Sequence, residues 1–150
     1  MDYRRLALAA VAAWVVDCIY GFFVYGVLLV AEFDRYPTVF RPPDEVNGLL
    51  ALMFGATLVG TFVMAYIFAK GHEGGNGLGE GFRFGVLLAA FGLFTMSIPN
   101  YVVYRYGRKL AVETAIAGLI EMLLTGVVFG LIYRPLARPR ATDVRRAIAV

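Results

Sequence analysis

Four long apolar stretches, separated by short polar segments, dominate the hydrophobic pattern of this chain. Each is close to the roughly 20 residues that a helix needs to cross a hydrocarbon core of about 30 Å. The first far exceeds the roughly 7–15 apolar residues of a signal peptide, so we expect it to be a true span. The pattern therefore predicts four membrane-spanning helices, over residues 6–30, 48–69, 84–104 and 110–133.

The composition favours a single transmembrane domain over residues 1–150. Hydrophobic residues make up 60% of the chain and the mean hydropathy is +0.71, whereas a soluble domain is about 45–50% apolar. Connections between successive spans favour an all-α, antiparallel up-down four-helix bundle. The basic residues lie in the termini and connections, so the net charge of +3 indicates membrane topology and lipid contact rather than nucleic-acid binding.

The distribution of Lys and Arg predicts the orientation. Nine lie at the N-terminus, in the second connection and in the C-terminal tail, and five lie in the other two connections. The positive-inside rule then places both termini in the cytoplasm, and we expect a multi-pass protein of the bacterial inner membrane. The tail 134–150 is basic, and we expect its arginines to contact lipid head groups: Arg134, Arg138, Arg140, Arg145 and Arg146.

Two carboxylates, Asp17 and Glu121, lie near the midpoints of the first and last spans, with no Lys, Arg or His at their depth. An ionisable group in mid-bilayer is costly and marks a functional-site hypothesis. Four states remain open: the groups are protonated, share one proton, bind a cation, or face a basic residue of a partner subunit. A structural role, in which a protonated carboxyl hydrogen-bonds a neighbouring helix, is an equal alternative.

Other polar residues can complete an intramembrane proton or cation site around these carboxylates. Tyr20 follows Asp17 at i+3, and Glu113 and Thr125 follow the four-residue spacing of Glu121. Glu113 has a simpler role as a first-turn residue at a helix N-terminus. Two more candidates lie in the middle and near the end of the third span, Thr95 and Asn100. Asn100 has the alternative role of an interfacial cap.

Three further features of the sequence indicate structural roles rather than a chemical site. Small residues at four-residue spacing favour close helix contacts, within the chain or between chains: Ala51/Gly55, Ala56/Gly60 and Gly126/Gly130. The glycine-rich segment 71–81 is expected to be a flexible connection, with His72 in solvent. Cys18 is the only cysteine, which excludes an internal disulfide and a cysteine metal site. We expect no metal and no cofactor.

Several short motifs resemble those of a group of small, uncharacterised bacterial four-span membrane proteins. They are Glu80-Gly81-Phe82-Arg83-Phe84-Gly85, the closing Ile132-Tyr133-Arg134-Pro135, the pair Arg41-Pro42 followed by an acidic residue, and the glutamate in the middle of the fourth span. The resemblance covers most of the chain. It implies the four-span architecture and no activity.

No catalytic constellation is recognisable, so we expect a protein that is not an enzyme. The first hypothesis is an accessory or structural subunit of a larger membrane complex, with other membrane proteins or a second copy as partners besides lipid. The alternative is a small proton- or cation-coupled transporter or channel that uses Asp17 and Glu121. A second alternative is a lipid or hydrophobic small-molecule binder.

Overall fold

The computed structural model describes residues 2–133, and over this range every regular element is helical. The all-α prediction is therefore confirmed for the described chain. The elements are α1 (Tyr3–Phe23), the π-helical turn η1 (Val24–Leu28), α2 (Val30–Phe33), α3 (Pro43–Gly71), α4 (Gly77–Gly92), the π-helical turn η2 (Leu93–Ser97), α5 (Ile98–Val103) and α6 (Arg108–Ile132).

Within residues 2–133, four helical stretches are long and apolar enough to cross a membrane, so the chain is a multi-pass membrane protein. Each of the predicted spans lies mostly inside one of them: Tyr3–Leu28, Pro43–Gly71, Gly77–Val103 and Arg108–Ile132. The third begins seven residues before the predicted start at Phe84. The side chain of Asn76 caps α4 by accepting the N–H of Leu78 at 3.2 Å, and Glu80 lies in its first turn. The expectation that 71–81 is entirely a connection is therefore wrong.

A proline accounts for the wide turn in the third span. Pro99 has no N–H, so it cannot donate to the carbonyl four residues earlier, at Thr95. The helix widens into η2 just before Pro99 and continues as α5. In the same turn, the side-chain hydroxyl of Thr95 donates to the backbone carbonyl of Phe91 at 2.6 Å.

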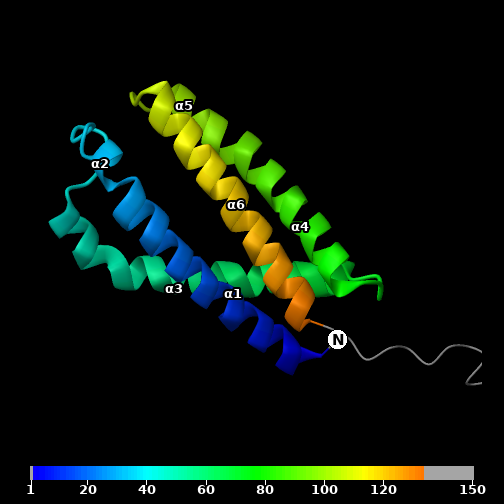
Figure 1. The fold of residues 1–150 in the computed structure, drawn as a ribbon. Helices are drawn as coiled ribbons and strands as arrows, with labels where there is room; N and C mark the ends of the chain where they lie inside the picture. The colour runs from blue at the N-terminus through cyan, green and yellow to red at the C-terminus, as the bar shows by residue number, and fades with distance from the viewer. Residues whose placement is uncertain (1, 134–150) are drawn as a thin grey trace, which may run out of the picture.

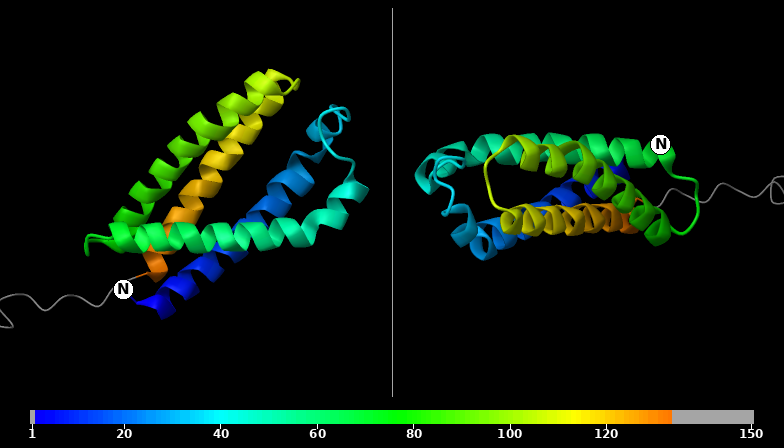
Figure 2. Two further views of the ribbon diagram at one scale, coloured as in Figure 1. Left: turned by 180° about the vertical axis from the view of Figure 1, so that it is seen from behind. Right: turned by 90° about the horizontal axis from the view of Figure 1, so that it is seen from above.

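The helices meet at one end of the molecule and spread apart toward the other (Figures 1 and 2). We call the first the terminal end, because α1 begins and α6 ends there, and the second the distal end, which holds α2 and α5. Helix α4 packs along α6, whereas α1 contacts both α3 and α6. Trp14 joins α1 to α3, since its indole N–H lies 3.1 Å from both the Phe54 carbonyl and the Thr57 hydroxyl.

The apolar core lies at the terminal end. Ala9, Ala10 and Ala13 give α1 a small, fully buried face there, against Phe68 of α3 and Phe129 of α6. The rings of Phe68 and Phe129 stack with centroids 6.0 Å apart. Small residues on α1 and aromatic residues on its neighbours therefore fill the place where the helices converge.

Glycines allow α4 and α6 to touch along their backbones. Gly81 and Gly85 of α4 face Gly126 and Gly130 of α6, and a Cβ on any of the four would lie 2.0–2.9 Å from backbone atoms of the other helix. The predicted close packing at Gly126/Gly130 is thus confirmed, within the chain. The glycines in the middle of α4 are tolerated because this contact offsets their low helix propensity, roughly 1 kcal/mol each.

Candidate functional site

Asp17 and Glu121 meet where α1 crosses α6. The two residues lie near each other on these contacting helices, and both are partly buried. Each lies near the middle of its candidate span. The structure thus brings together two acidic groups that the sequence places 104 positions apart, 17 and 121.

Two tyrosines of the first span complete the contact. The hydroxyl of Tyr25 donates to Oε2 of Glu121 at 3.2 Å, and the hydroxyl of Tyr20 donates to the carbonyl of Ala117 at 2.9 Å. We call Asp17, Tyr20, Tyr25 and Glu121 the carboxyl–tyrosine cluster. It contains acidic and hydroxyl groups only, so it can hold and share protons between α1 and α6.

Sequence reasoning missed Tyr25. In a regular helix of 3.6 residues per turn, Tyr25 points about 80° away from Asp17. The π-helical turn η1 contains Tyr25 and changes this register, and the long side chain reaches across to α6. A π-helical turn next to a polar group is a common feature of functional sites, but nothing in the local sequence signals this one.

The other residues predicted to complete the intramembrane site do not all lie beside Asp17 and Glu121. Thr125 is buried on α6, one turn beyond Glu121. Glu113 lies one turn from Lys109, whose Nζ is 3.7 Å away, and its Oε2 is enclosed without a hydrogen-bond partner among residues 2–133. Thr95 is exposed and bonds to its own helix, so it does not join the cluster.

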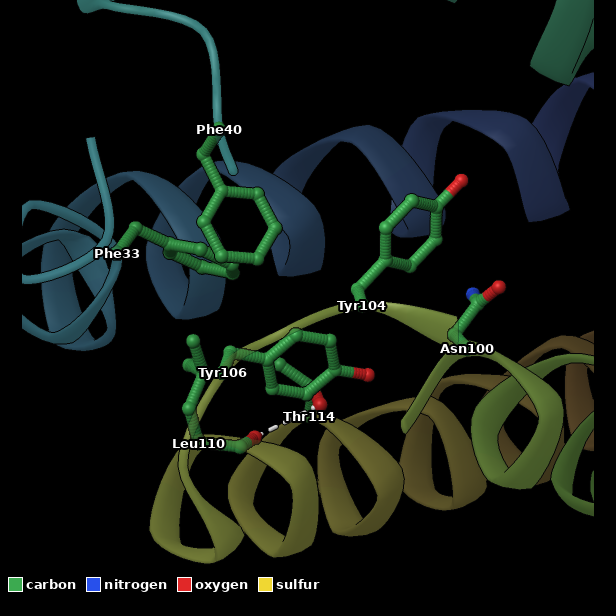
Figure 3. A pocket seen from close by; sticks show the side chains of 7 residues that line it. All are labelled: Phe33, Phe40, Asn100, Tyr104, Tyr106, Leu110 and Thr114. Atoms are coloured by element: carbon green, nitrogen blue, oxygen red, sulfur yellow. Dashed lines mark hydrogen bonds between the residues drawn. The ribbon is translucent and has the colours of Figure 1, made fainter. Parts of the chain in front are cut away.

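Asn100 lies in α5 at the distal end, away from the carboxyl–tyrosine cluster. It falls within the helix rather than at an end of it, so the expectation of a capping residue is wrong. Its side chain instead lines a cavity of about 190 Å³ between α5, α6 and the connection after α2 (Figure 3). The other lining residues are four aromatic residues and two from α6: Phe33, Phe40, Tyr104, Tyr106, Leu110 and Thr114.

Contacts between two connections close this distal end. Glu32 of α2 forms an ion pair with Lys109 of α6 and lies 3.2 Å from Arg35. The Lys109 hydrogen bond holds the pKa of Glu32 below its ordinary value. The hydroxyl of Tyr36 lies so close to Gly107 that a Cβ there would be 2.4 Å from it. The side chain of Tyr36 thus reaches from the first connection to Gly107 at the start of α6.

His72 is not in solvent, contrary to expectation. Its side chain is only 4% exposed, lies between the rings of Phe68 and Tyr133, and pairs with Glu80. Glu80 also accepts the backbone N–H groups of Glu73, at 3.1 Å, and Gly75, at 2.6 Å. Because a buried carboxylate is stable only when it is paired, the Glu80 carboxylate stays bound to His72 and to these two N–H groups. It thereby holds the glycine-rich connection in one conformation.

Within the described range, no three His, Cys, Asp or Glu side chains are placed to hold a metal ion. The five tail arginines proposed to contact lipid lie outside the described residues.

Comparison with known families fits this architecture. The model of a family described as "Protein of unknown function (DUF1761)" matches residues 8–130. The chain belongs to the DUF1761 family. The resemblance to an uncharacterised family is thereby confirmed, and no curated protein or solved structure matches the chain.

The family match spans residues 8–130 of this DUF1761 protein. It includes the carboxyl–tyrosine cluster, the glycine contact between α4 and α6, and the distal cavity. The basic tail lies beyond it. The family is described as one of unknown function, so it assigns no activity to this site.

Proposed function

We propose that the protein is an accessory or structural subunit of a larger membrane assembly, and that α3 is the helix it offers to a partner. The observation that carries this proposal is the isolation of the first half of α3. From Pro43 to Ala56 every residue except Leu50 is exposed, although the helix is apolar. Its second half packs on α1, and the Trp14 indole also reaches the Phe54 carbonyl near the middle of the helix. The exposed apolar side chains before that point are not covered by another part of the described chain.

The small residues of α3 strengthen this proposal. The backbone of α4 occupies the space beside Gly126 and Gly130 of α6. By contrast, a Cβ added at Gly55 or Gly60 of α3 would meet no atom within 4 Å. In lipid, small residues favour helix association because they let two backbones approach. A chain that uses one such motif internally and leaves another open has a surface suited to a second membrane helix.

A pair of glycine substitutions tests the subunit proposal. The protein is released from its host membrane in a mild detergent, and associated polypeptides are measured by native mass spectrometry. We expect a stoichiometric partner chain that Gly55→Leu displaces. Gly92→Leu is the matched control, because Gly92 also has open space but lies on α4. A chain that carries only lipid, or equal partner binding by both variants, contradicts the proposal.

The orientation and location belong to the same proposal. We place the terminal end in the cytoplasm of a bacterium and the four spans as an up-down bundle in its inner membrane. Support comes from the nine basic residues on the side of the termini against five on the other. A green fluorescent protein fusion at residue 150 should fluoresce, whereas a periplasmic alkaline phosphatase fusion there should be inactive.

A second candidate function rests on the carboxyl–tyrosine cluster. We propose as the alternative that the protein couples to proton or cation movement through Asp17 and Glu121. Support comes from the proximity of the two acidic residues at the crossing of α1 and α6, where the Tyr25 hydroxyl also donates to Glu121. Acidic groups that face a bundle interior are typical of proton and ion pathways.

Flux through liposomes tests this alternative. With a pH gradient imposed, the wild type should move protons or monovalent cations, and Asp17→Asn and Glu121→Gln should each abolish the flux. Thr95→Val is the control, because its hydroxyl bonds to the Phe91 carbonyl of its own helix and faces outward. Flux equal to that of empty liposomes rules the alternative out.

A further inference from the structure

The distal cavity has walls that suit a flat ring. Phe33 and Phe40 meet edge to face with centroids 4.9 Å apart, and Phe40 and Tyr106 lie 5.9 Å apart. Tyr104 stands on another side of the same space, above Leu110 and Thr114 (Figure 3). Tyr101, which does not line the cavity, meets Tyr106 edge to face with ring centroids 6.2 Å apart.

The lining is uncharged, but it carries polar groups that are free to bind. Asn100, Tyr104 and Tyr106 make no side-chain hydrogen bond within residues 2–133. By contrast, the hydroxyl of Thr114 is already used, because it donates to the Leu110 carbonyl at 2.8 Å. Ligand sites are typically apolar concavities with a few such polar groups, which fix the ligand's orientation.

The charges around the uncharged lining disfavour a cationic occupant. Glu32 and Asp34 flank Phe33 along the chain, and Glu32 is paired with both Lys109 and Arg35. Arg105 and Arg108 lie in the same turn as Tyr106 and disfavour a cationic ligand. Burial raises the pKa of Tyr106, with a smaller contribution from Tyr104, so its hydroxyl stays a hydrogen-bond donor at neutral pH.

The size and position of the cavity narrow the ligand further. A volume of about 190 Å³ equals roughly six water molecules at about 30 Å³ each, which is room for a one- or two-ring head group. Val102 and Val103 lie on α5 beside the cavity and are 78% and 71% exposed. An apolar tail attached to the ring can therefore extend along α5 into lipid.

We propose that the distal cavity binds a neutral, flat ring with hydrogen-bond-accepting oxygens, the chemistry of a membrane quinone head group. The ring lies between Phe40, Tyr104 and Tyr106. Its oxygens accept hydrogen bonds from the Asn100 amide and the tyrosine hydroxyls. This binding site is independent of the subunit role of α3, and it involves no redox step.

Binding of two matched probes to the protein in lipid nanodiscs tests the proposal. The probes are 2-methyl-1,4-naphthoquinone and 2-methylnaphthalene, which share a ring system and differ in the two oxygens. Saturable binding is measured by ligand-observed NMR, with empty nanodiscs as the baseline. We expect the quinone to bind at least about tenfold more tightly, because it alone can accept the two or more available hydrogen bonds.

Variants at the cavity locate the site. Asn100→Leu and Tyr104→Phe should each weaken quinone binding about three- to tenfold and leave the naphthalene unaffected. Thr114→Leu fills the floor and should weaken both probes. Tyr66→Phe is the control, because Tyr66 is an exposed tyrosine on α3 outside the cavity.

Four results overturn the proposal. Three are equal affinity for the two probes, quinone binding that survives both Asn100→Leu and Tyr104→Phe, and binding no greater than that of empty nanodiscs. The fourth is quinone binding retained in Thr114→Leu, which places the quinone elsewhere on the protein. Helix content by circular dichroism verifies that each variant is folded, and the exposed position of Asn100 makes its replacement the least disruptive.

Discussion

The glycine contact between α4 and α6 makes a quantitative prediction. In Gly126→Ala the new Cβ would lie 2.4 Å from the carbonyl oxygen of Gly81 and 2.6 Å from Cα of Gly85. Both neighbours are backbone atoms and cannot turn aside. Ordinary contact begins at 3.4 Å, so the two helices must separate by about 0.8–1.0 Å.

The separation sets the expected loss of stability. A gap of about 0.5–1 Å removes roughly a quarter to a half of the dispersion attraction between the atoms that it separates. Overpacked substitutions in well-packed interiors cost about 1–3 kcal/mol. We therefore expect Gly126→Ala to lower the free energy of unfolding by about 1–3 kcal/mol, although alanine is the better helix former.

The matched control lies on the same helix. Gly118 of α6 has no atom within 4 Å of a Cβ position, so Gly118→Ala should be neutral or stabilising, by up to about 1 kcal/mol. Unfolding by SDS in maltoside micelles can be followed by the fluorescence of Trp14, the only tryptophan. If Gly126→Ala is as stable as Gly118→Ala, the backbone contact does not hold α4 and α6 together.

Two further predictions concern the connections at opposite ends. Since the Lys109 hydrogen bond holds the pKa of Glu32 below its ordinary 4.5, this docking contact is fully present above about that pH and is lost as pH falls through the lower folded value. After correction for the intrinsic pH dependence of exchange, hydrogen exchange of the distal connection should therefore accelerate in acid for the wild type. In Glu32→Gln the corrected exchange rate should not depend on pH. An equal pH response in both proteins would contradict this role of Glu32. Glu80→Ala should accelerate exchange of the Gly75 amide at least tenfold, because that amide donates to Glu80 at 2.6 Å, whereas Glu73→Ala should leave the Gly75 amide protected.

The candidate site was predictable only in part. The mid-span positions of Asp17 and Glu121 are visible in the sequence, because a long apolar stretch makes any carboxylate stand out. Their contact is not visible, since it depends on which helices cross and at what height. Tyr25 was missed because η1 breaks the regular helical period from which shared faces are predicted.

The small-residue motifs were also predictable only in part. Gly126/Gly130, Ala51/Gly55 and Ala56/Gly60 carry equivalent spacing, yet only the first is packed within the chain. Of the partner glycines on α4, Gly81 lies in the segment 71–81, whose glycine content predicts a flexible connection, and Gly85 lies in the predicted third span. Spacing indicates that a close approach is possible, but it does not say which helix approaches.

The sequence by itself determined that this protein is all-helical and has four membrane-length helices, because hydrophobicity and length act locally along one helix. Only the tertiary structure decided which polar groups meet: the carboxyl–tyrosine cluster, the burial of His72 against Glu80, and the aromatic cavity at the distal end. Each of these depends on side chains from different helices. Their meeting is set by contacts between helices, such as the backbone contact at Gly126, which no periodicity along the chain encodes.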